Sequence, residues 1–227
     1  MSRFRPRRTI PQALRAAKPP GDRLNEWPPA TVPRLLELLW LAFDRVKSAK
    51  LARVNLSTDD LQLERSVNEL LADELQHLLG ETDGFATYVI QHERFENESI
   101  DPRSNRPPQY DLAFIWNDDP TLMWPCEAKV LKTPGAVAPY LHDVRDAFLA
   151  CVYAPFSSSG AMLGLLISGS PEHAFQNISA KLPAKLDKCP PHLARPHRIS
   201  IHSRTVPAEK SYPQEFTLHH LILELSG

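Results

Sequence analysis

The sequence predicts an α/β or α+β fold around one mixed β-sheet, and two observations support this. Its 227 residues fit one large domain that can bury a sizeable core, with ordinary globular composition. Apolar residues recur at helical and strand spacings in the order helix, helix, strand, hairpin, helix, strand, helix, two strands. We therefore expect one sheet flanked by helices over residues 32–227, preceded by an arm over 1–31.

The arm at residues 1–31 is rich in proline and arginine. Residues 1–23 hold seven basic residues and one acidic residue, whereas the whole chain carries a net charge of −1. Such an arm can bind the phosphate backbone of a nucleic acid, and a solvated tail is the alternative. The arginines that we assign to phosphate binding are Arg3, Arg5, Arg7 and Arg8.

Two helices are expected next. The first covers about 32–53, with Thr31 as a possible cap. The second follows "NLSTDD", where Ser57 or Thr58 can serve as the N-cap, and ends near Gly80. A strand at 85–95 and a polar, proline-rich loop at 96–109 follow.

A hairpin is predicted from strands at 110–116 and 122–131, joined through "NDDPT". If residue 116 pairs with 122, positions that sum to 238 face each other, and Asp111 lies opposite Glu127. Lys129 shares the face of Glu127, because side chains alternate along a strand. Pro125 can introduce a bulge that shifts this register.

The remaining elements are a helix at 136–154, a strand at 161–169, a helix at 171–182 and two C-terminal strands. His202 and Arg204 alternate with isoleucines, so they can bind phosphate from one strand face or lie at a solvated edge. Arg145 can reach a phosphate or pair with a neighbouring aspartate. His219 and His220 point to opposite faces and are interpreted as structural.

The cysteines and the apolar runs bear on location. Cys126, Cys151 and Cys189 are odd in number and show no zinc-ligand spacing, which indicates reduced thiols and a cytoplasmic protein. No run reaches the roughly 18 apolar residues of a membrane span, and the arm lacks the apolar stretch of a signal peptide.

The charges of the hairpin suit phosphodiester hydrolysis. Asp111 and Glu127 offer the hard oxygen ligands that Mg²⁺ or Mn²⁺ takes, and such an ion activates water and neutralises the scissile phosphate. Lys129 can orient that water or stabilise the transition state. The alternative is an ordinary hairpin with a charged rim.

Asp111, fifteen intervening residues and then Glu127-Ala128-Lys129 after an apolar strand resemble the PD-(D/E)XK, or restriction-endonuclease-like, nuclease superfamily. Asp111 follows Tyr110 rather than the proline of the common form. The resemblance implies a restriction-endonuclease-like mixed sheet flanked by helices, here with an N-terminal helical extension. It also implies the Ala128 carbonyl as a metal ligand and a further acidic residue on the preceding helix, for which we choose Glu64, with Glu74 in reserve.

The function expected from this resemblance is a metal-dependent nuclease, with DNA as the favoured substrate. Compact bacterial members often act against foreign DNA, which implies the effector of an anti-phage defence system. A homodimer, or a partner protein that selects the target, is expected. The main alternative is a catalytically inactive subunit that keeps the fold and binds nucleic acid or serves as a scaffold.

Overall fold

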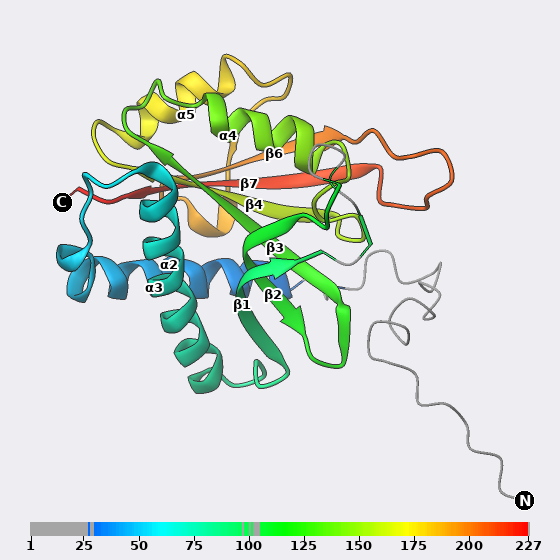
Figure 1. Cartoon of the computed structure of the whole chain (residues 1–227), viewed down its shortest axis with the longest axis horizontal. Coiled ribbons are helices and arrows are strands. Elements are labelled where there is room, and N and C mark those ends of the chain that lie inside the picture. Colours follow the sequence, from blue (N-terminus) through cyan, green and yellow to red (C-terminus); the bar gives the residue numbers. More distant parts are fainter. Residues whose placement is uncertain (1–26, 28–29, 97, 100, 102–104, 227) are drawn as a thin grey trace, which may run out of the picture.

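A seven-stranded mixed sheet forms the centre of the protein in the computed structural model, which describes residues 27, 30–96, 98–99, 101 and 105–226. The strand order is β1-β2-β3-β4-β7-β6-β5, and four α-helices lie against the sheet in the described ranges (Figure 1). The α/β class is therefore confirmed. The arginines at positions 3, 5, 7 and 8 lie outside the described residues.

Helices α2 (Thr31–Ala49) and α3 (Asp60–Glu81) match the two predicted helices, but their ends differ. The N-cap of α3 is Asp59, which accepts a hydrogen bond from the Gln62 backbone N–H, rather than Ser57 or Thr58. Thr31 lies inside the first turn of α2 rather than capping it, and a short 3₁₀ turn, η1 (Leu51–Arg53), completes the expected range.

The hairpin consists of β2 (Gln109–Trp116) and β3 (Asp119–Leu131), and β1 (Tyr88–Phe95) pairs with the outer edge of β2. Leu112 pairs with Cys126 and Ala113 pairs with Pro125, so the predicted register is confirmed over residues 112–115. The expected pair of residues 116 and 122 does not form, because Trp116 pairs with Asp119, and the ladder ends before Asp111 and Glu127. The register shifts between Ile115 and Trp116, near the turn, and not at Pro125. Consequently β3 begins three residues earlier than expected.

The second half of the sheet is built from β4 (Ser159–Leu166), β5 (Asp187–Lys188), β6 (His197–Ser203) and β7 (Glu215–Glu224). Strand β4 runs parallel to both β3 and β7, whereas the other neighbours are antiparallel. The helix predicted at 136–154 is shorter: α4 (Ala138–Asp143) passes into η2 (Val144–Phe148), a π turn. Helix α5 (Pro171–Ser179) follows β4.

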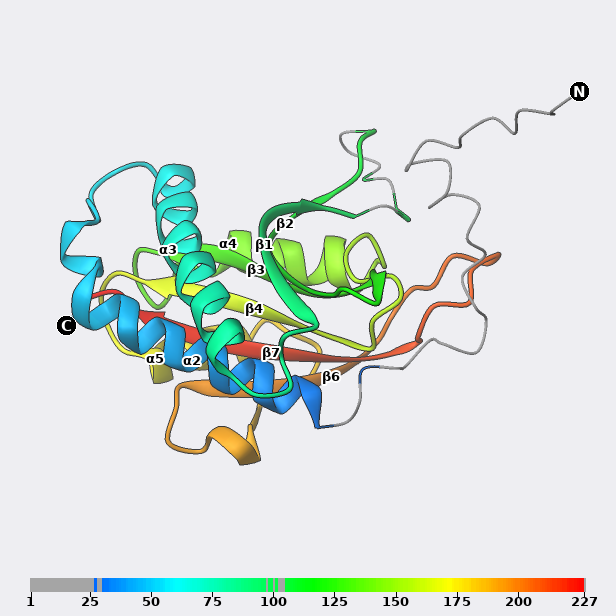
Figure 2. The same ribbon diagram turned by 90° about the horizontal axis from the view of Figure 1, so that it is seen from below.

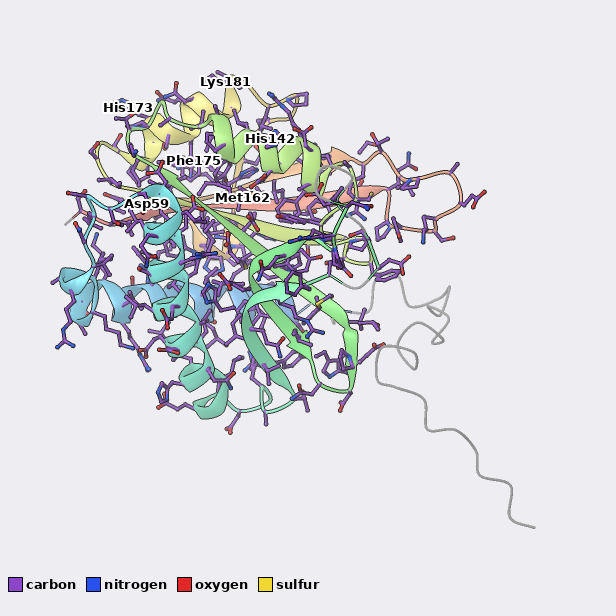
Figure 3. All side chains as sticks on the ribbon, viewed as in Figure 1. Asp59, His142, Met162, His173, Phe175 and Lys181 are labelled. Atoms are coloured by element: carbon purple, nitrogen blue, oxygen red, sulfur yellow. The ribbon has the colours of Figure 1, made fainter. Side chains whose placement is uncertain are left out.

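Two apolar cores lie on the two faces of the sheet, so the fold has three layers. The α2–α3 core packs these helices against Cys126, Ala128 and Val130 of β3, among others. The α4–α5 core packs α4, η2 and α5 against the other face, where Phe175 of α5 and Met162 of β4 belong (Figure 3). Figure 2 shows α2 and α3 together on their side of the sheet.

None of the helices in these described ranges combines the length and apolar character that crossing a membrane requires.

Candidate active site

The candidate site lies where strands β2 and β3 stop pairing with each other. Their backbone pairing ends at Leu112 and Cys126, so the next N–H groups along that edge of β3 need other acceptors. The Ala128 N–H donates to Asp111 Oδ2 at 2.7 Å, and the Val130 N–H donates to Glu64 Oε1 at 2.9 Å. The open edge of β3 therefore fixes two of the predicted carboxylates, one from β2 and one from α3.

The Lys129 ammonium lies among four carboxylates. Its Nζ is 2.8 Å from Glu127 Oε1 and 3.1 Å from Asp143 Oδ2, and it donates to the Ala128 carbonyl oxygen at 2.7 Å. Glu64 Oε2 and Asp111 Oδ2 are further away, at 3.8 and 4.0 Å. We call Glu64, Asp111, Glu127 and Asp143 the carboxylate cluster.

Glu127 is the most deeply buried member of the carboxylate cluster, with 5% of its surface exposed. Burial, and then the neighbouring Asp111, raise its pKa well above the ordinary value, although Lys129 acts in the opposite direction. Its Oε2 is buried without a hydrogen-bond partner among the residues that the structure describes. This oxygen has lone pairs free for a cation or a proton.

Glu64 and Lys129 have shifted pKa values as well. Burial raises the pKa of Glu64, which Lys129 only partly offsets. Burial alone would lower the pKa of Lys129, but Glu127, Asp111 and Asp143 together raise it above its ordinary value. Lys129 is thus charged, and one ammonium faces four acidic groups.

Asp143 is the member of the carboxylate cluster that sequence reasoning missed. The sequence suggests at most an ion pair between this residue and Arg145 at the helix surface, but Asp143 is buried at the end of α4. Tyr140, Val144 and Ala147 are also buried, and 143 falls at the spacing of that apolar face. This spacing is the signal that could have identified it.

Glu74, the reserve choice, lies in another environment. Its carboxylate is paired with Arg45 at 3.0 Å and with Lys50 at 3.1 Å. Hydrogen bonding to Arg45 lowers its pKa, opposite to the shift of Glu64. The structure therefore brings Glu64, and not Glu74, to β3.

The three other predicted phosphate-binding residues do not join the carboxylate cluster. Arg145 is exposed and donates to the Lys181 carbonyl. Arg204 is buried, and its guanidinium donates to the carbonyls of Ala154, Pro155 and Pro213 at 2.8, 3.2 and 3.0 Å.

His202 is likewise buried, with its Nε2 2.6 Å from Ser200 Oγ. His202 lies in β6 and Arg204 directly follows its last residue, and both are buried, so neither a phosphate contact nor a solvated edge describes them. Strand β6 buries Ser200 and His202 and leaves Ile201 exposed, so the alternation of the isoleucines indicated the wrong buried face at this end of the strand. Internal hydrogen bonds make the inward polar face possible.

The carboxylate cluster fits a divalent metal ion by the chemistry of its donors. Asp111 and Glu127 offer carboxylate oxygens, one of them unpartnered, and the Ala128 carbonyl oxygen lies beside them. No three carboxylates in the described part of the chain bring their oxygens within 4.8 Å of one another. Carboxylate and carbonyl oxygens are nevertheless the types of donor that Mg²⁺ takes in proteins.

The chain matches no protein-family model, and no match to it is found among curated proteins or solved structures.

Proposed function

We propose that this protein is a metal-dependent nuclease that hydrolyses phosphodiester bonds, with DNA as its substrate and Mg²⁺ or Mn²⁺ as its cofactor. The observation that carries the proposal is the convergence of Glu64, Asp111, Glu127 and Asp143 on Lys129. One ammonium cannot neutralise four ionised carboxylates, so the buried site favours a bound proton, consistent with the raised pKa of Glu127, or an additional cation that replaces this proton.

The order of elements around the site supports a restriction-endonuclease-like core. Helix α3, the three strands β1–β3, helix α4 and the parallel strand β4 follow one another along the chain. Asp111 and Glu127 lie on adjacent strands, and Glu64 comes from the helix that precedes the sheet. These are the positions that the family resemblance implies.

Asp111, Glu127 and the Ala128 carbonyl would hold the metal ion. Once bound, the ion supplies an activated water molecule and positive charge next to the scissile phosphate. Lys129 Nζ donates to the Ala128 carbonyl oxygen in this structure, and the second lone pair of that oxygen would be the one available to a metal ion. Lys129 then remains within reach of Asp143 and can donate to the attacking water or to a phosphate oxygen.

The cellular context that we propose follows the family resemblance. The protein would act in the cytoplasm, where buried free thiols such as those of Cys126, Cys151 and Cys189 stay reduced. It would serve as the effector of a prokaryotic anti-phage defence system. A homodimer or a partner protein would supply target selection, with the basic arm at 1–31 contacting the phosphate backbone.

The second candidate is a catalytically inactive subunit that binds nucleic acid or serves as a scaffold. The observation in its favour is the position of Lys129. Its ammonium pairs with Glu127 and Asp143 and donates a hydrogen bond to the Ala128 carbonyl oxygen. In that case Lys129 would act as a permanent counter-ion, and no divalent metal would be needed.

A nuclease assay on single- and double-stranded DNA and RNA, with Mg²⁺, Mn²⁺ or a chelator, tests the proposal. We expect metal-dependent cleavage of DNA, and a loss of about 10²-fold or more in Glu127→Gln and Lys129→Ala. Glu74→Gln is the matched control for Glu64→Gln, because both glutamates lie on α3 and each has 9% of its surface exposed.

Equal cleavage by wild type and Glu127→Gln would overturn the assignment of the site. If the wild type binds DNA but cleaves none of the substrates with either metal, the second candidate is the correct one.

A further inference from the structure

A second cluster of metal-ligating side chains lies away from the carboxylate cluster. Cys189, His197 and His219 are all buried, and one ligand atom from each lies within 4.8 Å of the other two. Cys189 precedes η3 (Pro190–His192), His197 opens β6 and His219 lies in β7. We call these three residues the cysteine–histidine cluster.

The two clusters lie on different faces of the sheet. His219 lies beside Trp124, and His197 contacts Trp40, both of which belong to the α2–α3 core. Lys129 instead pairs with Asp143 of α4, on the other face. An ion bound by the cysteine–histidine cluster would therefore be separate from the proposed catalytic ion.

We propose that Cys189, His197 and His219 bind a structural Zn²⁺ ion. A thiolate with imidazole nitrogens is a donor set that selects zinc over Mg²⁺. His197 Nε2 and His219 Nδ1 lie 3.1 Å apart. Two nitrogens bound to one tetrahedral Zn²⁺ are about 3.3 Å apart, so the rings need little adjustment.

The protonation state of the rings agrees with this assignment. Burial lowers the pKa of His197 to about 2 and that of His219 to about 4. Both rings are therefore neutral at neutral pH, which is the form that binds a metal. Burial raises the pKa of Cys189, which disfavours the thiolate, so the ion would have to displace the proton of this thiol.

We assign the fourth ligand to His192, at the end of η3, whose ring has to move toward the other three residues because it does not share their 4.8 Å spacing. Its ring stacks on that of His197, with 5.1 Å between centroids, and a hydrogen bond with the Pro33 backbone holds it. Its Nε2 is buried and has no partner within the described ranges. The spacing Cys-x₂-His-x₄-His over 189–197 is of the kind that zinc sites use, although it involves one cysteine only.

Trp40 is the neighbour that has to adjust. Its Nε1–H donates to His197 Nδ1 over 3.4 Å, a long hydrogen bond, which leaves the ring proton on Nε2. Zinc at Nε2 requires that proton on Nδ1, so the Trp40 contact would be lost on binding. Trp40→Phe should therefore bind zinc at least as tightly as the wild type.

The zinc content of the purified full-length chain, by mass spectrometry, is the first test. We expect about one zinc per chain. Replacement by Co²⁺ should give the absorption of a tetrahedral site with a thiolate charge-transfer band. Absence of bound zinc, together with no such band when Co²⁺ is added to chelator-treated protein, would overturn the proposal.

Matched variants locate the ion. Cys189→Ser and His219→Gln should weaken zinc binding more than about 100-fold, since even outer-shell changes cost about 10–100-fold. Cys151→Ser and His220→Gln, also at buried positions, should bind as the wild type does. Retention of zinc by Cys189→Ser, or equal losses in the controls, would overturn the assignment, and unchanged affinity in His192→Ala would overturn its role as fourth ligand.

Glu127→Gln distinguishes this site from the catalytic one. It should keep the zinc and lose nuclease activity, and loss of the zinc in this variant would show that the two sites are not separate.

Discussion

Lys129 sets the charge balance of the carboxylate cluster. Its ammonium contacts Glu127 and Asp143 directly and lies within 4.0 Å of Glu64 and Asp111. Removing one partner from a buried ionic group leaves the others uncompensated, which is more costly than the pairing itself is favourable. The side chain thus has a structural role besides the catalytic one that we propose.

Lys129→Met is expected to lower the free energy of unfolding by about 3–5 kcal/mol without metal, because four carboxylates then share the site with no cation. Mg²⁺ or Mn²⁺ should restore part of this loss. Denaturant unfolding with and without the ion measures both effects. Lys132→Met, which removes an exposed lysine paired with Asp60, should change little. Equal stability of the wild type and Lys129→Met would contradict this account.

Glu127 makes the stability of the metal-free protein depend on pH. Its pKa is raised well above 4.5 in the folded state, so the folded protein holds this proton to a higher pH than the unfolded chain. The stabilisation from the bound proton is complete below 4.5 and is lost as the pH rises through the raised pKa.

Glu127→Gln should remove the decrease in stability that the wild type shows as the Glu127 proton dissociates. The metal-free variant should therefore be more stable than the wild type at neutral pH. The free energy of unfolding of the wild type and of Glu127→Gln, measured over about pH 5–8 with a chelator present, tests this prediction. Glu74→Gln should be less stable than the wild type at neutral pH, because Arg45 lowers the pKa of Glu74 and its charge stabilises the fold. A Glu127→Gln profile parallel to that of the wild type would refute the prediction.

At the scale of the elements, the divergence of β2 and β3 creates the site. The sequence predicted the pairing of Leu112 with Cys126, although the turn is shorter than expected and the expected pair of residues 116 and 122 does not form. The sequence did not predict that the backbone pairing of β2 with β3 stops at these two residues. Where pairing stops depends on which other groups can accept hydrogen bonds from the free N–H groups of β3. Here the replacements are the carboxylates of Asp111 and Glu64.

Asp111 has two separable roles, as the acceptor for the Ala128 N–H and as a proposed metal ligand. Asp111→Asn keeps an acceptor oxygen and should retain most of the stability while losing nuclease activity. Asp111→Ala should lose both, with a cost of about 1.5–3 kcal/mol, because a hydrogen bond to a charged group is removed. Denaturant unfolding together with the nuclease assay compares them. Equal stability of the Asn and Ala variants would show that the acceptor contributes nothing.

At the scale of the whole molecule, the sheet separates the two proposed ion sites. The α2–α3 core covers the cysteine–histidine cluster, whereas Lys129 and Asp143 meet on the α4 side. Glu127 and Cys189 share no hydrogen-bond or ion-pair partner among the described residues. The two sites should therefore act independently on stability.

The double variant Glu127→Gln plus Cys189→Ser tests this independence. The changes in unfolding free energy should add within about 0.5 kcal/mol, as is usual for sites without shared partners. Unfolding of the wild type, both single variants and the double variant completes the cycle. A coupling energy above about 1 kcal/mol would mean that the sheet transmits changes between its faces.

The sequence by itself determined the α/β class and the pairing of residues 112–115 in the hairpin, because helix and strand periodicities are local properties. Strand alternation also grouped Asp111, Glu127 and Lys129, whereas Glu64 was chosen because of the family resemblance, and the roles of these four residues stay predictions. The tertiary structure alone brought in Asp143, turned His202 and Arg204 inward and joined Cys189, His197 and His219. These depend on which segments meet across the sheet and on buried hydrogen bonds between residues far apart in the chain. Local spacing carries little of that information.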